Sequence, residues 1–190
     1  MAGEVVVHSS AVSAFDYDVT AWVVAHRSAQ LNAVMKTMTW LGTWVALAAG
    51  AILMGALVFL RRLPVVAAVL AILAWGGEAL GVSLAKNVVQ RVRPPKDIWL
   101  MNARGWSWPS GHAATAAVVF AVLAIVVTYL NGRSAVTWLA WIVAISLIAA
   151  TGFSRIELGV HWTTDVLASF IFVAAWLGVM WATLGRPGRT

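Results

Sequence analysis

The stretch AATAAVVFAVLAIVVTYL, residues 113–130, is an unbroken apolar run whose only ionisable group is the phenol of Tyr129. About 20 such residues are enough for one helix to cross the hydrocarbon core of a bilayer. Four more runs of this kind cover residues 38–60, 63–85, 134–153 and 164–184. A buried helix of a water-soluble protein would explain one of them, but five in succession indicate membrane crossings.

The composition agrees with this assignment. The chain has 190 residues, of which 62% are hydrophobic and only 11% are charged, whereas about a quarter of the residues in a soluble domain carry charge. The sequence therefore predicts an all-α, polytopic transmembrane bundle with five spanning helices in a domain of residues 38–190. Residues 1–37 form a separate N-terminal segment. The absence of Cys excludes disulfides and thiolate metal sites.

Within the N-terminal segment, residues 14–36 mix apolar side chains at helical spacing with charged ones. The apolar positions are Phe15, Val19, Trp22 and Val23, and the charged positions among them are Asp16, Asp18 and Arg27. This pattern is typical of an amphipathic helix that lies in the membrane interface. A sixth crossing is the alternative that the sequence leaves open.

The positive net charge of +6 raises the question of a nucleic-acid partner. Several of the basic residues instead lie at the ends of apolar runs: Arg61, Arg62, Arg133, Arg186 and Arg189. Anchoring to anionic lipid headgroups explains these positions better. We therefore expect the lipid bilayer as a partner and no nucleic acid, while the sequence does not determine the oligomeric state.

Three polar blocks interrupt the apolar chain. They are KNVVQRVRP at residues 86–94, PSGH at 109–112 and SRIELGVHWTTD at 154–165. The runs 113–130 and 134–153 make one return trip across the membrane, so the loops before and after this pair must lie on the same side. The sequence therefore predicts that the three blocks meet.

In the first block, Lys86 and Arg93 are seven residues apart, or about two helical turns. Both cations would project from one face if the preceding helix continued as far as Pro94, which cannot donate the next backbone hydrogen bond. Two cations on one face suit a phosphate group. Headgroup anchoring by long basic side chains is the structural alternative.

The second block has the features of a helix start. Ser110 is a candidate N-cap, Gly111 allows close approach to the backbone, and His112 falls in the first turn. Free amide groups and the helix dipole favour an anion at such a position. A capped helix with an interfacial histidine is the simpler interpretation of this block by itself.

In the third block, Arg155 precedes His161 by six residues and Asp165 follows it by four. The i to i+4 spacing places the carboxylate beside the imidazole, where it can keep one ring nitrogen protonated and leave the other free to attack. A purely structural His–Asp pair remains the alternative for this block.

Together the blocks resemble the type 2 phosphatidic acid phosphatase (PAP2) superfamily. Its pattern is Lys, six residues and Arg-Pro, then Pro-Ser-Gly-His, then Ser-Arg, five residues, His, three residues and Asp. The chain matches it at Lys86, Arg93, Pro94, Pro109, Ser110, Gly111, His112, Ser154, Arg155, His161 and Asp165. The resemblance implies that His161, His112 and Asp165 are catalytic, and that Lys86, Arg93, Ser110, Gly111 and Arg155 bind the phosphate. It implies neither a cofactor nor a metal.

The function implied by this resemblance is hydrolysis of a lipid phosphate or pyrophosphate through a phosphohistidine. Polyprenyl pyrophosphate, phosphatidylglycerol phosphate and phosphatidic acid are the candidate substrates. The alternatives are a non-catalytic lipid-phosphate-binding membrane protein and an enzyme similar to vanadate-dependent haloperoxidases. We expect a bacterial plasma membrane protein with its site on the extracytoplasmic side. Many membrane members have six spanning helices, and here the interfacial segment replaces the first.

Overall fold

The computed structural model describes residues 10–184, and in this range it contains helices and no strand. The predicted all-α fold is therefore confirmed. In chain order the helices are α2 (Ser10–Ala25), α3 (Ala29–Met38), the short 3₁₀ helix η1 (Thr39–Gly42), α4 (Trp44–Phe59), α5 (Val65–Val89), the short 3₁₀ helix η2 (Lys96–Ile98), α6 (Gly111–Asn131), α7 (Ala135–Glu157) and α8 (Thr163–Leu184). The outer ends of the two predicted domains, residues 1–9 and 185–190, lie outside the described residues.

Four helices, α5 to α8, are long and apolar enough to cross a membrane. A fifth crossing requires that α3, η1 and α4 count as one span, and this run bends by 50° at its break. The run predicted at 38–60 begins too early, because α4 starts only at Trp44. Thr43 has an extended backbone and its hydroxyl accepts a hydrogen bond from the amide of Val45, so it caps a new helix.

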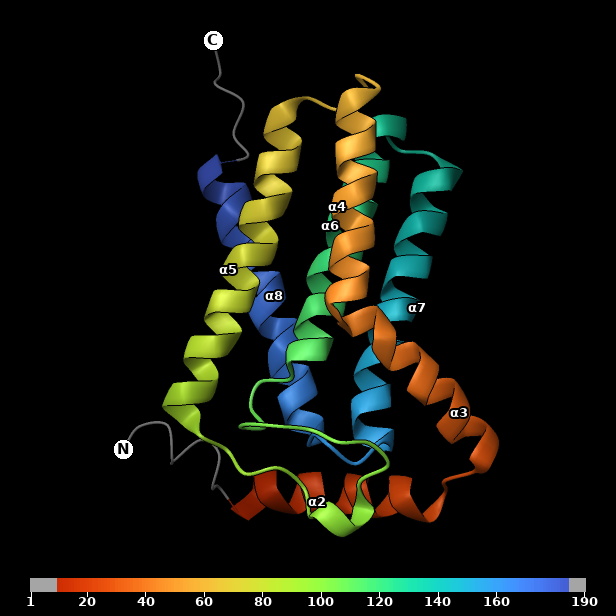
Figure 1. The fold of residues 1–190 in the computed structure, drawn as a ribbon, viewed down its shortest axis with the longest axis vertical. Coiled ribbons are helices and arrows are strands. Elements are labelled where there is room, and N and C mark those ends of the chain that lie inside the picture. Colours follow the sequence, from red (N-terminus) through yellow and green to blue (C-terminus); the bar gives the residue numbers. More distant parts are fainter. Residues whose placement is uncertain (1–9, 185–190) are drawn as a thin grey trace.

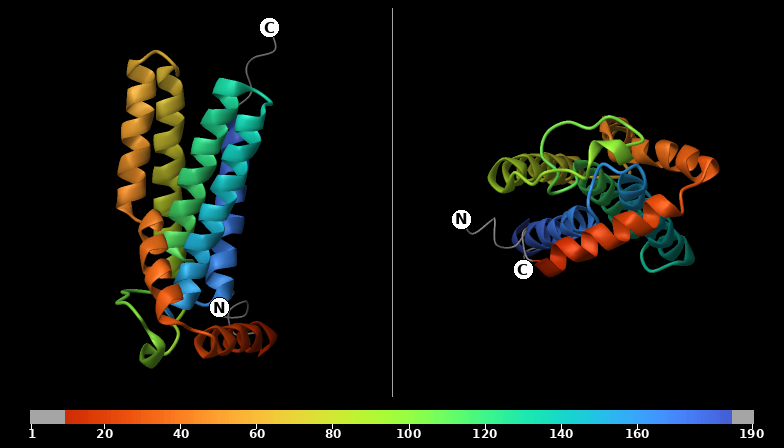
Figure 2. Two further views of the ribbon diagram at one scale, coloured as in Figure 1. Left: turned by 90° about the vertical axis from the view of Figure 1, so that its right-hand side faces the viewer. Right: turned by 90° about the horizontal axis from the view of Figure 1, so that it is seen from below.

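Helix α6 is the centre of the bundle (Figures 1 and 2). It packs against α4, α5, α7, α8 and η1. In α6, 56% of the apolar window is buried, against 22–28% in the other spans. Its first turns carry the buried Ala113, Ala114, Ala116 and Ala117, and such small side chains let neighbouring helices approach closely inside a membrane. The alanines bring the other helices around the start of α6.

Helix α2 lies across one end of the bundle, roughly at right angles to the spanning helices (Figure 1). It exposes Phe15, Tyr17 and Trp22 and buries Asp16 and Val23. This arrangement agrees with the prediction of an amphipathic helix in the N-terminal segment. The single helix predicted over 14–36 is instead two, because the chain turns after Ala25 and Ser28 caps α3 by accepting a hydrogen bond from the amide of Leu31.

The long α5–α6 connection and the short α7–α8 connection lie at the end of the bundle that α2 covers (Figures 1 and 2). The α7–α8 connection turns back at Gly159, whose φ of +72° is in the left-handed region that favours glycine. The amide of Leu100 donates a hydrogen bond to the carbonyl of Leu158, which joins the two connections. The expectation that the three polar blocks lie on one side is thereby confirmed.

Candidate active site

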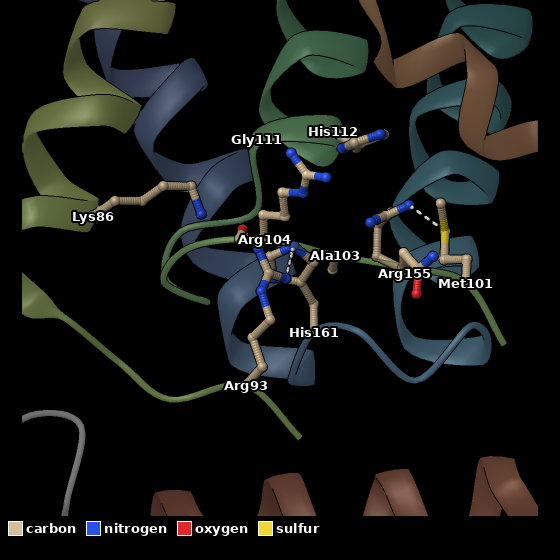
Figure 3. Close-up of a pocket in the computed structure, with 10 residues that line it drawn as sticks. Lys86, Arg93, Met101, Ala103, Arg104, Gly111, His112, Arg155 and His161 are labelled. Carbon is tan, nitrogen blue, oxygen red and sulfur yellow. Dashed lines mark hydrogen bonds between the residues drawn. The ribbon is translucent and has the colours of Figure 1, made fainter. Parts of the chain in front are cut away.

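A pocket of about 280 Å³ opens between these connections and the first turn of α6 (Figure 3). The predicted site residues that line it are Lys86, Arg93, Gly111, His112, Arg155 and His161, and the α5–α6 connection adds Met101, Asn102, Ala103 and Arg104. Residues from all three polar blocks therefore share one cavity. The other two predicted residues, Ser110 and Asp165, are fully buried and are not part of the lining.

His161 and Asp165 form the pair that their spacing predicted. His161 lies in the α7–α8 connection and Asp165 lies in the first turn of α8, with 3.3 Å between Nδ1 of the ring and Oδ2 of the carboxylate. The other ring nitrogen, Nε2, lies 2.9 Å from the Arg93 guanidinium (Figure 3). This geometry fits a neutral ring that donates from Nδ1 to Asp165 and accepts at Nε2 from Arg93.

The pKa of His161 agrees with a neutral ring. The side chain is 2% exposed. Burial, the largest cause, and the positive charges of Arg93 and Arg155 together lower the pKa of His161 to about 3, although Asp165 opposes the shift. The Nε2 lone pair is therefore available at neutral pH, which is the state that a nucleophile requires.

The carboxylate of Asp165 is held by several groups besides His161. Its Oδ2 atom accepts hydrogen bonds from the hydroxyl of Ser107 and from the amide of Trp162, the latter at 3.0 Å. Its Oδ1 atom accepts a hydrogen bond of 2.6 Å from Arg91. Because both oxygens have charged or strong donors, the carboxylate stays ionised and cannot rotate freely.

Arg93 reaches the pocket in a different way from the prediction. Helix α5 ends at Val89, with Gln90 in the left-handed conformation at φ 51°, so Lys86 and Arg93 do not share a helical face. Arg93 extends from the loop and donates to the carbonyls of Val160, Arg104, Gly105 and Trp106, at 2.6 to 3.2 Å. Burial lowers the pKa of Arg93, with Asp165 opposing, but a guanidinium keeps its charge in proteins.

Lys86 remains in the last turn of α5, where the prediction placed it. Its Nζ atom donates to the carbonyls of Trp106 at 2.7 Å and Ser107 at 3.3 Å. The ammonium group therefore holds the same stretch of the α5–α6 connection that Arg93 holds. Both cations are bonded to neutral carbonyls, and neither is paired with a carboxylate among residues 10–184.

The third predicted cation, Arg155, lies in the last turn of α7 and is 2% exposed. Its guanidinium donates to the hydroxyl of Thr39 at 2.5 Å and contacts the sulfur of Met101 at 3.1 Å. Its Nε atom is buried and has no hydrogen-bond partner. A buried guanidinium with an open donor is poised to bind an anion.

The start of α6 has the predicted cap. The hydroxyl of Ser110 accepts from the amide of Ala113 at 3.5 Å, and Gly111 and His112 line the pocket. Ser110 itself is fully buried behind this turn, and its carbonyl accepts a hydrogen bond from Ser169. In this structure Ser110 therefore caps α6, while Gly111 and His112 line the pocket.

Sequence reasoning did not single out three residues that shape the site, Asp16, Arg91 and Ser107. It did expect the stretch 96–108, with Arg104, to form the rim of the site. Arg104 lines the pocket, and its guanidinium makes no hydrogen bond with the described part of the chain. Arg91 stands between Lys86 and Arg93 in the first polar block. That position was the signal available for it, whereas its burial could not be read from the sequence. The signal available in the sequence for Asp16 was its position between the aromatic residues Phe15 and Tyr17.

Comparisons with known proteins agree with the site. A model of the PAP2 superfamily matches residues 63–189. The chain is 33% identical to phosphatidylglycerophosphatase B of Bacillus subtilis (strain 168) over 165 residues. This match covers 86% of this chain and 80% of that protein. The crystal structure of the transmembrane PAP2 type phosphatidylglycerolphosphate phosphatase from Bacillus subtilis matches with a TM-score of 0.88 and 28% identity, over 98% of this chain and 92% of that one. Aquifex aeolicus LpxE shares the fold, with a TM-score of 0.59 and 22% identity over 85% of this chain and 94% of that one.

The close contact between η1 and α6 generates a prediction about the pocket. A Cβ atom added at Gly42 would lie 2.8 Å from the Cα of His112, and it would meet backbone, which cannot rotate away. Gly42→Ala should cost about 1–3 kcal/mol of stability, and the displaced α6 start should weaken binding of orthovanadate, a phosphate-shaped anion. Thermal unfolding and vanadate titration in detergent measure both effects.

Gly55→Ala is the matched control, because a Cβ at Gly55 meets nothing within 4 Å. It should not lower the unfolding midpoint, because Ala favours a helix more than Gly does, and it should leave the vanadate affinity at the wild-type value. Wild-type vanadate affinity in Gly42→Ala would show that the pocket does not depend on this contact.

Proposed function

The chain belongs to the PAP2 superfamily of lipid phosphatases, and from this premise we propose that it hydrolyses a lipid phosphate through a phosphohistidine on His161. The observation that carries the proposal is the orientation of this ring. Nδ1 faces the buried carboxylate of Asp165, while Nε2 faces a pocket lined by cations and by the start of α6. This arrangement combines an activated nucleophile with a binding site for its phosphoryl substrate.

In the first step, Nε2 of His161 attacks phosphorus, and the bond from phosphorus to the lipid oxygen breaks. His112 gives a proton to the leaving oxygen, so the lipid departs as an alcohol or, from a pyrophosphate, as a monophosphate. Asp165 stabilises the positive charge that develops on the phosphorylated ring. In the second step, water attacks phosphorus, His112 recovers a proton from it, and inorganic phosphate leaves with both histidines restored.

The phosphoryl oxygens need positive charge in the transition state, and four basic side chains supply it. These are Lys86, Arg93, Arg104 and Arg155. The amides at the start of α6, where Gly111 stands, add donors and the positive end of the helix dipole. The Arg93 guanidinium that now rests on Nε2 would move to the phosphate when substrate enters. Catalysis by positioning and charge alone is sufficient for phosphoryl transfer.

Among lipid phosphates, we propose phosphatidylglycerol phosphate as the preferred substrate. The support is the relative at 33% identity, which is named phosphatidylglycerophosphatase B. Polyprenyl pyrophosphate and phosphatidic acid have the same chemistry at the phosphoryl end and remain competitors.

The proposed catalytic and phosphate-binding residues fall within 38–190, which we take as the phosphatase domain, with 1–37 as its N-terminal segment.

We further propose that the protein lies in a bacterial plasma membrane with its pocket outside the cytoplasm. The double arginine Arg61–Arg62 and Arg133 lie at the end of the bundle opposite the pocket, and Arg186 and Arg189 follow α8 in sequence. On the pocket side, the cations Arg27, Lys86, Arg91, Arg93 and Arg155 are engaged in contacts within the protein. Positive residues that are free to act as topology signals thus favour the opposite end as cytoplasmic.

The mechanism predicts the effect of removing the dyad. His161→Ala should lower kcat by at least about 1,000-fold, and Asp165→Asn should lower it by about 100-fold or more, because the nucleophile is lost or no longer oriented. Phosphate release from phosphatidylglycerol phosphate by purified protein in detergent measures this. His26→Ala, which removes an exposed histidine outside the pocket, should turn over normally. Full turnover by His161→Ala, or an absolute requirement for an added divalent metal, would contradict the mechanism.

The substrate proposal predicts an order of specificity. In a panel of phosphatidylglycerol phosphate, phosphatidic acid and polyprenyl pyrophosphate at matched detergent concentration, kcat/KM should be highest for the first by about 10-fold, the effect of roughly 1.4 kcal/mol of differential transition-state binding. A higher kcat/KM for polyprenyl pyrophosphate would reassign the substrate while leaving the chemistry intact.

The orientation is testable by cysteine labelling, since the chain has no native Cys. Lys96 is exposed on the pocket side, and Asn131 is exposed at the opposite end of the bundle. A membrane-impermeant maleimide should label Lys96→Cys in intact cells and Asn131→Cys only after the membrane is opened. The reverse pattern would place the pocket in the cytoplasm.

A further inference from the structure

An acidic residue of α2 is buried against the catalytic pair. Asp16 is 1% exposed, although its neighbours Phe15 and Tyr17 are 47% and 58% exposed. Its carboxylate accepts a 2.6 Å hydrogen bond from Arg91 and a 2.9 Å hydrogen bond from the amide of Thr164, and it also accepts one from the Thr164 hydroxyl. Helix α2 therefore places a negative charge against Thr164, the residue that precedes Asp165 in α8.

Arg91 joins this charge to the catalytic one. One terminal nitrogen donates to Asp16, and the other donates to Oδ1 of Asp165 at 2.6 Å and to the Thr164 hydroxyl at 2.7 Å. The guanidinium also lies 5.6 Å from the centre of the Trp162 ring. Arg91 is 9% exposed and the other three side chains are at most 2% exposed, so the series His161, Asp165, Arg91 and Asp16 leads from the pocket to α2 with little exposure to solvent.

The charges of this series decide what Asp16 does. Among residues 10–184, Arg91 is the only donor to Oδ1 of Asp165, whereas Oδ2 accepts hydrogen bonds from Ser107, Trp162 and His161. Without Asp16, the guanidinium would be free to form a two-pronged pair with Asp165, the geometry that arginine and carboxylates prefer. Such a pair would rotate the carboxylate away from His161 and neutralise the charge that must stabilise the phosphorylated ring.

Docking of α2 does not by itself account for the buried ions. Val23 of the same helix packs against Ala113, Ile156 and Val166 in a buried apolar cluster, and Tyr17 contacts the Trp162 ring edge-on at 4.9 Å. These contacts attach the helix without burying charge. Two buried carboxylates and a guanidinium are costly to desolvate compared with apolar contacts of the same size, which argues for a role beyond attachment.

We propose that Asp16 and Arg91 are positioning residues for the phosphatase reaction, and that Asp16 holds Arg91 in the single-donor geometry that orients Asp165 toward His161. The inference rests on the proposed function, because it concerns the same dyad. Asp16 touches neither substrate nor the reacting nitrogen and acts through Arg91. Helix α2 is then a part of the active site, although it contributes nothing to the lining of the pocket.

The decisive variant is Asp16→Asn, compared with Asp18→Asn, which changes an exposed acid two residues along the same helix. Asp16→Asn should lower kcat by about 10- to 100-fold, the effect expected of a misaligned catalytic group, with KM within about threefold because no substrate contact is lost. Asp18→Asn should match the wild type in both constants. Wild-type kcat in a folded Asp16→Asn protein would overturn the proposal.

A double variant separates positioning from general damage to the fold. In the Asp165→Asn background, adding Asp16→Asn should cause little further loss of kcat, since its effect passes through Asp165. An equal loss in both backgrounds would show a purely structural role and overturn the inference. If Asp16→Asn does not fold, Thr164→Val decides, because it removes the hydroxyl bonded to both Asp16 and Arg91. A lower kcat with unchanged KM in that variant supports the proposal, and wild-type kcat overturns it.

The same assays distinguish the two levels of the argument. A wild-type protein that releases no phosphate from any lipid phosphate overturns both the proposed function and the role of Asp16. An active wild type with an unaffected Asp16→Asn variant overturns only the role of Asp16.

Discussion

The carboxylate of Asp165 is fully buried, and the segments around it are arranged to satisfy it. Ser107 and Arg91 come from the two ends of the α5–α6 connection, while His161 and the amide of Trp162 come from the α7–α8 connection. An ionised carboxylate left unpaired in such a place costs several kcal/mol. The chain can bury Asp165 only in the conformation that also assembles the pocket. The contacts that hold the pair of His161 and Asp165 are therefore also the contacts that fold this end of the bundle.

The basic residues around the pocket fall into two groups according to their partners. Arg91 faces two carboxylates, and its charge is used inside the protein. Lys86 and Arg93 are held by backbone carbonyls, and Arg155 is held by a hydroxyl and a thioether. Neutral acceptors fix the position of a cation without cancelling its charge. The pocket therefore keeps a net positive field for an incoming phosphate, and the first polar block supplies cations of both kinds.

The sequence alone predicted the features that depend on local spacing. Apolar run length gave the spans α5 to α8, the i to i+4 relation gave the pair of His161 and Asp165, and the Ser110 cap followed from its place before an apolar run. The prediction failed where a single residue changes the backbone: Gln90 adopts a left-handed conformation and ends α5 four residues before Pro94. Distant ion pairs were also out of reach, since Asp16 and Arg91 are 75 residues apart, and no local pattern specifies such a partner.

Helix α2 connects the expected membrane interface with the pair of His161 and Asp165, through Asp16 and Arg91. Its outward face presents Phe15, Tyr17 and Trp22, which suit the headgroup region, while its inward face presents Asp16 and Val23. Successive residues of a helix are turned by about 100°, so a shift of one position would replace the buried carboxylate with an aromatic ring and leave Arg91 with Asp165 alone. Two features therefore fix the rotation of this helix about its axis. Its exposed aromatic side chains suit the lipid headgroup region, and its one buried acid pairs with Arg91. In the proposed reaction the substrate arrives at the bilayer surface, and the helix that we expect to lie in that surface would also orient the proposed nucleophile.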